Sequence, residues 1–306
     1  MDGFFEKPNN VLLVDEVHNL IDRVRKNYSA VLSIKDFFDL EDCFQKEIKW
    51  LGENVKQKRI KTVIKKFEFF INLIQDFKNI FSSLEKGHHI LTNDYMKAFV
   101  LKLTSFLNTI KEYSLSHSKY FSNYALDLIE IFDYFKSIFE LSYDYSYTCY
   151  STNFNGKFSI HILCLDVAPL LQGRFLVNRT NILFSATLKP MDYFIKNMGL
   201  DSNTANISIP SPFDKEKFKI LISKNVKTFY NDRAATLPKV FSLINSFVSA
   251  KVGNYLVFVP SFEYLTMLKN YVEKSGIKFK FIFQDPLMTP KNKEEFLDNF
   301  KVNPVL

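Results

Sequence analysis

The chain has 306 residues and a formal net charge of +7, from 40 basic and 33 acidic side chains. Hydrophobic residues make up 47% and charged residues 24%, as in an ordinary soluble globular protein, and this length favours about two domains. No apolar run approaches the roughly 18–20 residues of a membrane span, and the N-terminus has no signal-peptide pattern, so we expect a cytoplasmic protein with no membrane partner.

The first predicted element is a buried strand at residues 11–14 (VLLV), which ends in the two acids Asp15 and Glu16, with His18 just beyond. Asn19 is suited to cap the helix that follows. Open α/β sheets place ligand chemistry at the carboxyl ends of their strands. Asp15 could therefore hold Mg²⁺, and Glu16 could orient and deprotonate an attacking water. The alternative is an exposed acidic turn that only starts a helix.

Residues 36–157 are predicted to form a helical block, because apolar residues recur there at i, i+3, i+4 and i+7. The block has 16 basic and 16 acidic side chains, so the excess positive charge lies in the flanking segments. The stretch 85–89 (EKGHH) is interpreted as a turn between helices. The lysine-rich stretch 56–66 is interpreted as the solvated face of a helix, with nucleic-acid binding as the alternative. Asn155-Gly156 predicts a hairpin.

Strands and helices are predicted to alternate after the block, which favours a parallel α/β sheet. The strands are expected at 180–188, 218–222, 254–261 and 279–284, and the helices at 191–200, about 236–250, 262–275 and from about Pro290.

Hydroxyl side chains mark two of these strand ends. Ser185 and Thr187, at the end of the strand at 180–188, could bond to the carboxylates of a neighbouring strand end and relay nucleotide state, or could form a generic turn. Ser261 precedes a helix, where a hydroxyl and free amides suit a phosphate, although a simple N-cap explains it equally.

Six segments occur together in the order and approximate spacing of the XPD/DinG-type DNA helicases, the iron–sulfur branch of superfamily 2. They are LLVDEVHNLIDRVR, NILFSATLKPMDYFIKNMGL, SPF, TFYNDR, GNYLVFVPSFEYLTML and FIFQDPLMTPKNKEEFLDNF. The chain most resembles the bacterial DinG-like members over nearly its whole length, weakly in the helical block. The DEAH motif of that family reads DEVH here, with Val17 in place of Ala. An unrelated helical-bundle scaffold would require all six matches to be coincidental.

The resemblance implies an α/β fold with three parts. Residues 1–35 and 158–208 would form a partial RecA-like motor domain, residues 36–157 an inserted all-helical arch, and residues 209–306 the N-terminal part of a second RecA-like domain. It also implies an ATP-dependent DNA helicase of DNA repair, in which hydrolysis of ATP with Mg²⁺ drives movement along single-stranded DNA and unwinding of the duplex.

Residue roles follow by the same resemblance. Asp15 would assist Mg²⁺ binding, and Glu16 would be the catalytic base. Ser261 would lie beside the DNA backbone, whereas Arg233, in TFYNDR, matches a family position whose role the spacing does not assign. The residues that would couple ATP state to movement are His18, Ser185 and Thr187.

Several family elements are not found in this sequence. Only ten residues precede the strand at 11–14, so the phosphate-binding loop with its Lys and the four cysteines that hold the iron–sulfur cluster are missing. The three cysteines of the chain lie beyond that strand, match none of those ligands and are expected to be reduced thiols. They are Cys43, Cys149 and Cys164.

The arginine-finger motif is missing at the other end. Without these groups the isolated chain is expected to have negligible activity, a deficit of about 10³–10⁵ in rate by analogy with other NTPases. A partner polypeptide could supply the missing motifs. The alternative function is a non-catalytic module, derived from a helicase, that binds single-stranded DNA or a protein.

Overall fold

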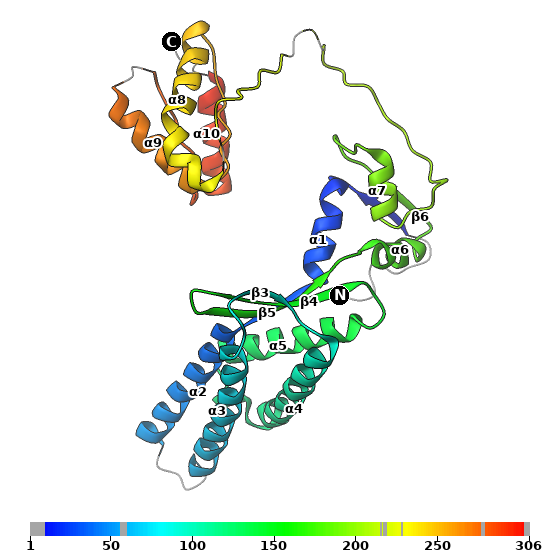
Figure 1. The fold of residues 1–306 in the computed structure, drawn as a ribbon, viewed down its shortest axis with the longest axis vertical. Helices are drawn as coiled ribbons and strands as arrows, with labels where there is room; N and C mark the ends of the chain where they lie inside the picture. The colour runs from blue at the N-terminus through cyan, green and yellow to red at the C-terminus, as the bar shows by residue number, and fades with distance from the viewer. Residues whose placement is uncertain are drawn as a thin grey trace. The chain divides into compact units, whose positions relative to one another are not determined.

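The computed structural model describes residues 10–55, 60–214, 216, 219–227, 229–276 and 279–302. The chain divides into two compact units, Met1–Ile207 and Ser208–Leu306. Both units are shown in Figure 1. Within the described residues, no helix is both long and apolar enough to cross a membrane.

The first unit contains a small parallel sheet made by two strands that are far apart in the sequence. Strand β1 (Val11–Val14) pairs with β6 (Thr180–Leu183) in parallel, in the register Val11↔Thr180 to Val14↔Leu183. The predicted strand at 11–14 is confirmed, but the prediction that it is buried is wrong, because Val11 and Leu13 are 52% and 62% exposed. Strand β6 ends five residues before the predicted end at 188. The elements that cover this pair are η1 (Val17–Asn19), α1 (Leu20–Asn27), α6 (Ala168–Leu176) and α7 (Met191–Asn197). Their shared core contains Val17, Ile21, Cys164, Val167, Leu171, Phe175 and Met198.

A second, antiparallel sheet of four strands has the order β2-β5-β4-β3. The strands are β2 (Ala30–Ser33), β3 (Gly87–Ile90), β4 (Tyr147–Phe154) and β5 (Lys157–Cys164). Asn155 and Gly156 join β4 to β5 with φ angles of +54° and +78°, which are the left-handed values that a two-residue hairpin requires, so the predicted hairpin is confirmed. The interpretation of 85–89 as a turn is wrong at its C-terminal end, because Gly87–Ile90 forms a strand paired with β4.

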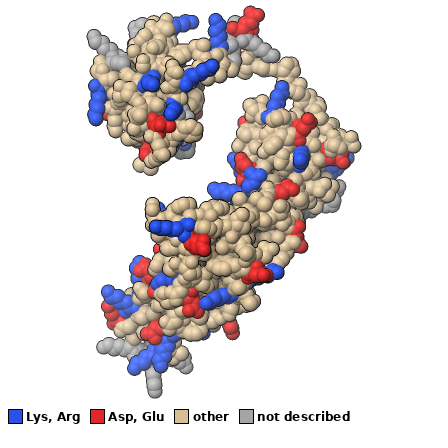
Figure 2. Space-filling model, viewed as in Figure 1, with Lys and Arg blue, Asp and Glu red and all other residues tan. Residues whose placement is uncertain are grey.

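Four long helices gather on one side of this sheet (Figure 1). They are α2 (Ile34–Asn54), α3 (Ile60–Ser82), α4 (Asn93–His117) and α5 (Asn123–Leu141), and a short turn η2 (Ser118–Tyr120) follows α4. The periodicity therefore predicts the helices correctly. The block is not all-helical as expected, because β3 and β4 lie within residues 36–157, and of the sheet only the hairpin β4–β5 was predicted. Alternate residues of the strands, among them Leu32, Cys149 and Ile160, complete the helical core. In Figure 2, basic and acidic side chains are interspersed over this helical part, as its balanced composition implies.

Phenylalanine dominates the core of the helical part. The Phe37 ring is fully buried and lies 4.9 Å from the Phe77 ring and 4.6 Å from the Phe132 ring, measured between centroids. Each such ring removes a large apolar area from water, and offset ring pairs add a further contribution. The helices are therefore held together mainly by a contiguous aromatic core from α2, α3, α4 and α5.

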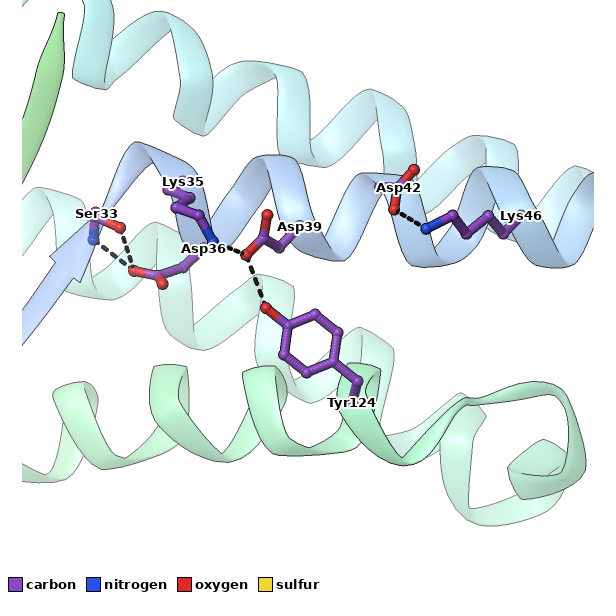
Figure 3. A network of polar contacts seen from close by, with 7 residues as sticks. All are labelled: Ser33, Lys35, Asp36, Asp39, Asp42, Lys46 and Tyr124. Atoms are coloured by element: carbon purple, nitrogen blue, oxygen red, sulfur yellow. Dashed lines mark hydrogen bonds and ion pairs between the residues drawn. The ribbon is translucent and has the colours of Figure 1, made fainter. Parts of the chain in front are cut away.

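Polar contacts fix the start of α2 where β2 ends (Figure 3). The amide and hydroxyl of Ser33 both donate to the Asp36 carboxylate, at 2.6 and 2.8 Å. One turn later, the hydroxyl of Tyr124 on α5 donates to Asp39 at 2.8 Å. The hydrogen bond from Lys35, and then that from Tyr124, lower the pKa of Asp39. These contacts satisfy the free amide at the helix N-terminus and link α2 to α5.

Thiol labelling tests whether the Cys149 side chain of β4 points into the core. Burial raises the pKa of the Cys149 thiol to about 11. At pH 8 its thiolate fraction is then roughly 100-fold below that of an ordinary thiol, and a reagent must also reach the sheet. We expect mass spectrometry to find Cys43, which is half-buried on α2, alkylated first, with Cys149 reacting only in denaturant. Equal labelling rates for these two thiols in the native chain would contradict the packing of β4.

The described part of the second unit contains the helices α8 (Arg233–Ala250), α9 (Phe262–Ser275) and α10 (Pro290–Val302), and a short turn η4 (Tyr230–Asp232) precedes α8. The small core of this unit is formed by α8 and α9. The predictions of these three helices are confirmed, with α8 beginning three residues early. The core residues are Leu237, Phe241, Tyr264, Leu268 and Val272.

The strands predicted in the second unit are not formed where the structure describes them, at 219–222, 254–261 and 279–284. Val259, Phe281 and Phe283 from these segments still pack against the core. A strand is defined by backbone hydrogen bonds to a neighbour, and apolar content alone does not provide one. The strand predictions at 254–261 and 279–284 are therefore wrong, although Val259, Phe281 and Phe283 are partly buried against the core.

Candidate functional site

The carboxyl ends of β1 and β6 lie side by side, and the candidate site is formed by the two turns that follow them. The ladder continues past both strands, because the Phe184 amide donates to the Val14 carbonyl at 3.0 Å and the Val17 amide donates to the Phe184 carbonyl at 3.2 Å. The turn with Asp15 and Glu16 is thereby held against the turn with Ser185.

Glu16 occupies the left-handed region of backbone conformation, with φ 50° and ψ 39°. This conformation costs a residue with a side chain about 1–3 kcal/mol unless the surroundings compensate for it. Two features compensate for it here: the Glu16 amide donates a hydrogen bond to Asp15 Oδ1 at 2.7 Å, and the neighbouring Val17 side chain is fully buried. Val17 is therefore accommodated in the core, and the Glu16 side chain remains 58% exposed.

A hydrogen-bonded cluster joins Glu16, His18 and Ser185, and we call it the acid–histidine–serine cluster. The Ser185 hydroxyl donates to Glu16 Oε2 at 3.2 Å. His18 Nδ1 lies 2.8 Å from Ser185 Oγ and 3.0 Å from Glu16 Oε2. Because a carboxylate oxygen can only accept, a hydrogen bond between His18 Nδ1 and Glu16 Oε2 requires a hydrogen on Nδ1. The cluster holds the Glu16 carboxylate in one orientation.

Asp15 and Thr187 lie at the edge of the cluster. The Asp15 side chain is exposed and accepts only from the amide of Glu16 in the described residues. The Thr187 amide donates to Ser185 Oγ at 3.4 Å, a long contact, and its hydroxyl has no hydrogen bond within the part of the chain that the structure describes. The structure thus brings Glu16, His18 and Ser185 into direct contact and leaves Asp15 and Thr187 available to a ligand.

The carboxylates of this site suit Mg²⁺ only when a phosphate-containing ligand supplies further oxygen atoms. Mg²⁺ in nucleotide sites is held by one or two carboxylates, several waters and phosphate oxygens, a role that the exposed Asp15 can fill. Across the described residues, no group of three His, Cys, Asp or Glu side chains is placed to hold a metal ion without such a ligand. Nor does any described Lys or Arg form an ion pair with Asp15 or Glu16.

Ser261 and Arg233 belong to the second unit. Ser261 is the N-cap of α9, and its hydroxyl accepts from the Tyr264 amide at 3.2 Å, so its contacts are those of a simple N-cap. The Arg233 guanidinium lies over the rings of Tyr230 and Tyr264, at 5.3 and 5.9 Å from their centroids. The sequence carried no signal for these aromatic partners, because Tyr264 is 31 positions away in the chain.

Comparison with known proteins gives one informative similarity. No family model matches the chain. The chain is 23% identical, over an alignment of 339 positions, to the ATP-dependent DNA helicase CHL1 of Debaryomyces hansenii. The alignment covers 96% of this chain but 40% of the relative, so the chain spans about two fifths of the length of the protein it matches. This similarity supports a helicase-like class at a coarse level.

Proposed function

We propose that this chain is a portion of an ATP-dependent DNA helicase and carries the carboxylate edge of its ATP-hydrolysing site. The observation that carries the proposal is the acid–histidine–serine cluster, on adjacent carboxyl ends of the parallel strands β1 and β6. Such an edge is where α/β sheets bind ligands. The similarity to a protein named as an ATP-dependent DNA helicase supports the same function.

In this proposal the two acids have separate roles. Asp15 binds the hydration shell of Mg²⁺, which supplies positive charge to the phosphates when it is bound. Glu16 accepts the proton of the attacking water and is oriented for that role by Ser185 and His18. His18, Ser185 and Thr187 sense the nucleotide and relay its state to the DNA-binding surfaces.

The isolated chain is proposed to be inactive. Phosphoryl transfer depends on cations that neutralise the phosphates, and in the described residues the site pairs its carboxylates with no Lys or Arg. A polypeptide with a phosphate-binding loop and an arginine finger would supply that charge. The test is DNA-stimulated ATP hydrolysis by the chain combined with such a polypeptide, with Glu16→Gln as the decisive variant.

Ser185→Ala tests the coupling role. Removing one hydrogen bond, which is worth about 1 kcal/mol, should slow ATP hydrolysis by the combined motor no more than about 10-fold. Duplex unwinding, measured by strand release in a fluorescence assay, should fall by a much larger factor. Ser202→Ala, an exposed serine in the turn after α7, is the control and should change neither rate. Equal losses in hydrolysis and unwinding would assign Ser185 to hydrolysis alone and contradict a coupling role.

A second candidate function is a non-catalytic, helicase-derived module that binds single-stranded DNA or a protein partner. It is favoured by the same lack of cationic partners at the carboxylates in the described residues. This module would bind DNA in a salt-dependent manner that nucleotide does not change. A combined motor that hydrolyses ATP through Glu16 would exclude it.

A further inference from the structure

An apolar groove in the second unit is a second candidate binding surface. One wall of the groove is formed by α8 and the other by residues 255–260, which lie between α8 and α9. Its volume is about 470 Å³, within the range of sites that bind apolar groups. Among the described residues that line it, Arg233 alone carries a charge. The other α8 residues of the lining are all apolar: Val240, Leu243, Ile244, Phe247 and Val248.

Large side chains of this groove are exposed to water. Phe258 is 89% exposed and Leu256 62%. Phe247, Val257 and Leu243 are exposed as well. Single exposed apolar residues are common on soluble proteins, whereas a contiguous group of them marks a surface that binds a partner. The lining therefore favours an apolar occupant.

The backbone of residues 255–260 is unpaired too. In the described residues, no amide or carbonyl of this segment forms a hydrogen bond with another backbone group. Its sequence, YLVFVP, is rich in the aromatic and β-branched residues that favour strands. The similar apolar run of β1, VLLV, pairs along all four residues with β6. The segment thus has the composition of a strand and the free backbone groups of a sheet edge.

These two features together select one kind of occupant. A small apolar molecule would fill the groove but leave the backbone groups unpaired. A strand from another polypeptide satisfies both, because its main chain pairs with the edge while alternate side chains enter the groove. Six residues of strand span about 20 Å. The chain spans only about two fifths of the helicase that it matches, so the relative contains much further sequence from which such a strand can come.

We propose that residues 255–260 pair with a strand of the polypeptide that completes the motor, and that apolar side chains of this strand fill the groove. The inference rests on the proposed function, which requires such a polypeptide for its phosphate-binding loop and arginine finger. The side chains that enter the groove are apolar, because a charged group placed there would lose its hydration. The backbone pairing fixes the register of the two polypeptides.

The test compares hydrogen exchange of residues 255–259 in the wild-type chain alone and in the combined motor, by mass spectrometry. In the chain alone these amides should exchange at close to the rate of an unstructured peptide, because they have no backbone hydrogen bond in the described residues. In the combined motor about half of them, those on the paired edge, should exchange on the order of 100-fold more slowly. Protection in the chain alone, or unchanged exchange in the combined motor, would overturn the proposal.

Proline variants test the pairing directly. Adjacent amides of a strand point to opposite edges, so Leu256→Pro and Val257→Pro are made separately and one of them removes an amide from the paired edge. That variant should bind the second polypeptide about 10- to 100-fold more weakly in isothermal titration calorimetry, because a hydrogen bond is lost and the ring obstructs the ladder. Both variants should melt like the wild type when alone, since the segment has no backbone hydrogen bond to lose in the described residues.

Val252→Pro is the matched control. Val252 lies between α8 and α9 but does not line the groove, and its replacement should leave the affinity unchanged. Wild-type affinity in both groove variants would overturn the proposal. Failure of the wild-type chain to bind the second polypeptide would also overturn it, as would self-association of the chain that either groove variant abolishes, which would make a second copy the occupant.

The outcome is separable from that of the proposed ATP hydrolysis. Glu16 belongs to the first unit, so Glu16→Gln should keep the affinity for the second polypeptide and the protection of residues 255–259. Hydrolysis that depends on Glu16 while the segment stays unprotected would refute the docking alone. Protection of the segment in a combined motor without hydrolysis would refute the proposed function alone.

Discussion

Glu16→Gln is expected to lower DNA-stimulated ATP hydrolysis by about 10²–10⁴-fold in the motor formed by this chain and a polypeptide with a phosphate-binding loop. Glutamine has nearly the shape of glutamate and can still accept the hydrogen bond from Ser185, so the acid–histidine–serine cluster should persist. The amide cannot accept the proton of the attacking water. The measurement is the rate of phosphate release at saturating ATP and single-stranded DNA.

Asp22→Asn is the matched control for this prediction. Asp22 is a surface carboxylate on α1, 84% exposed and paired with Arg25, and its loss should change the rate less than about 2-fold. Without the second polypeptide, the chain should hydrolyse ATP only at the background rate, both as the wild type and as either variant. Wild-type turnover by the isolated chain that disappears in the Gln variant would contradict its proposed inactivity. An unchanged rate for the Gln variant in the combined motor would remove Glu16 from the mechanism.

Phe37→Ala is expected to destabilise the first unit by about 3–5 kcal/mol, the range for removing a fully buried aromatic side chain. The cavity would open at the centre of the aromatic core, where the Phe37 ring contacts three rings from two other helices. Their centroids lie at 4.9 Å (Phe77, α3), 5.5 Å (Phe81, α3) and 4.6 Å (Phe132, α5). Trp50, the single tryptophan, lies on α2, so its fluorescence during urea unfolding reports on this unit.

Phe69→Ala is the control with the same chemical change at an exposed position of α3. Its ring is 44% exposed, and its removal should cost about 1 kcal/mol or less. If both variants lost the same free energy of unfolding, Phe37 would not be at the centre of the core.

Local pattern predicted the elements with strong signals. The apolar run before Asp15 formed β1, the Asn155-Gly156 pair formed the hairpin, and the predicted helix at 262–275 formed α9 with those bounds. Each of these depends on side chains a few positions apart, which is the range over which periodicity and turn residues act.

Short strands were not predictable from local pattern. Strand β2 has four residues, and β3 is the stretch Gly87–Ile90, which begins with glycine, a residue that is depleted in strands. Both strands form because β4 and β5 offer them free edges, with β3 on one side and β2 on the other. In the second unit the opposite occurred, since the strand-like run at 254–261 found no ladder partner in the described residues.

The sequence by itself determined which chemical groups end each strand, an acid pair after β1 and hydroxyls after β6, because an apolar run that stops at polar residues is a local property. Only the tertiary structure decided that Ser185 donates to Glu16, a residue 169 positions earlier in the chain. The same holds for the stacked rings of His88, Tyr150 and His161, which come from the three strands β3, β4 and β5. The register of paired strands sets both contacts, and that register follows from how the whole core packs rather than from any single segment.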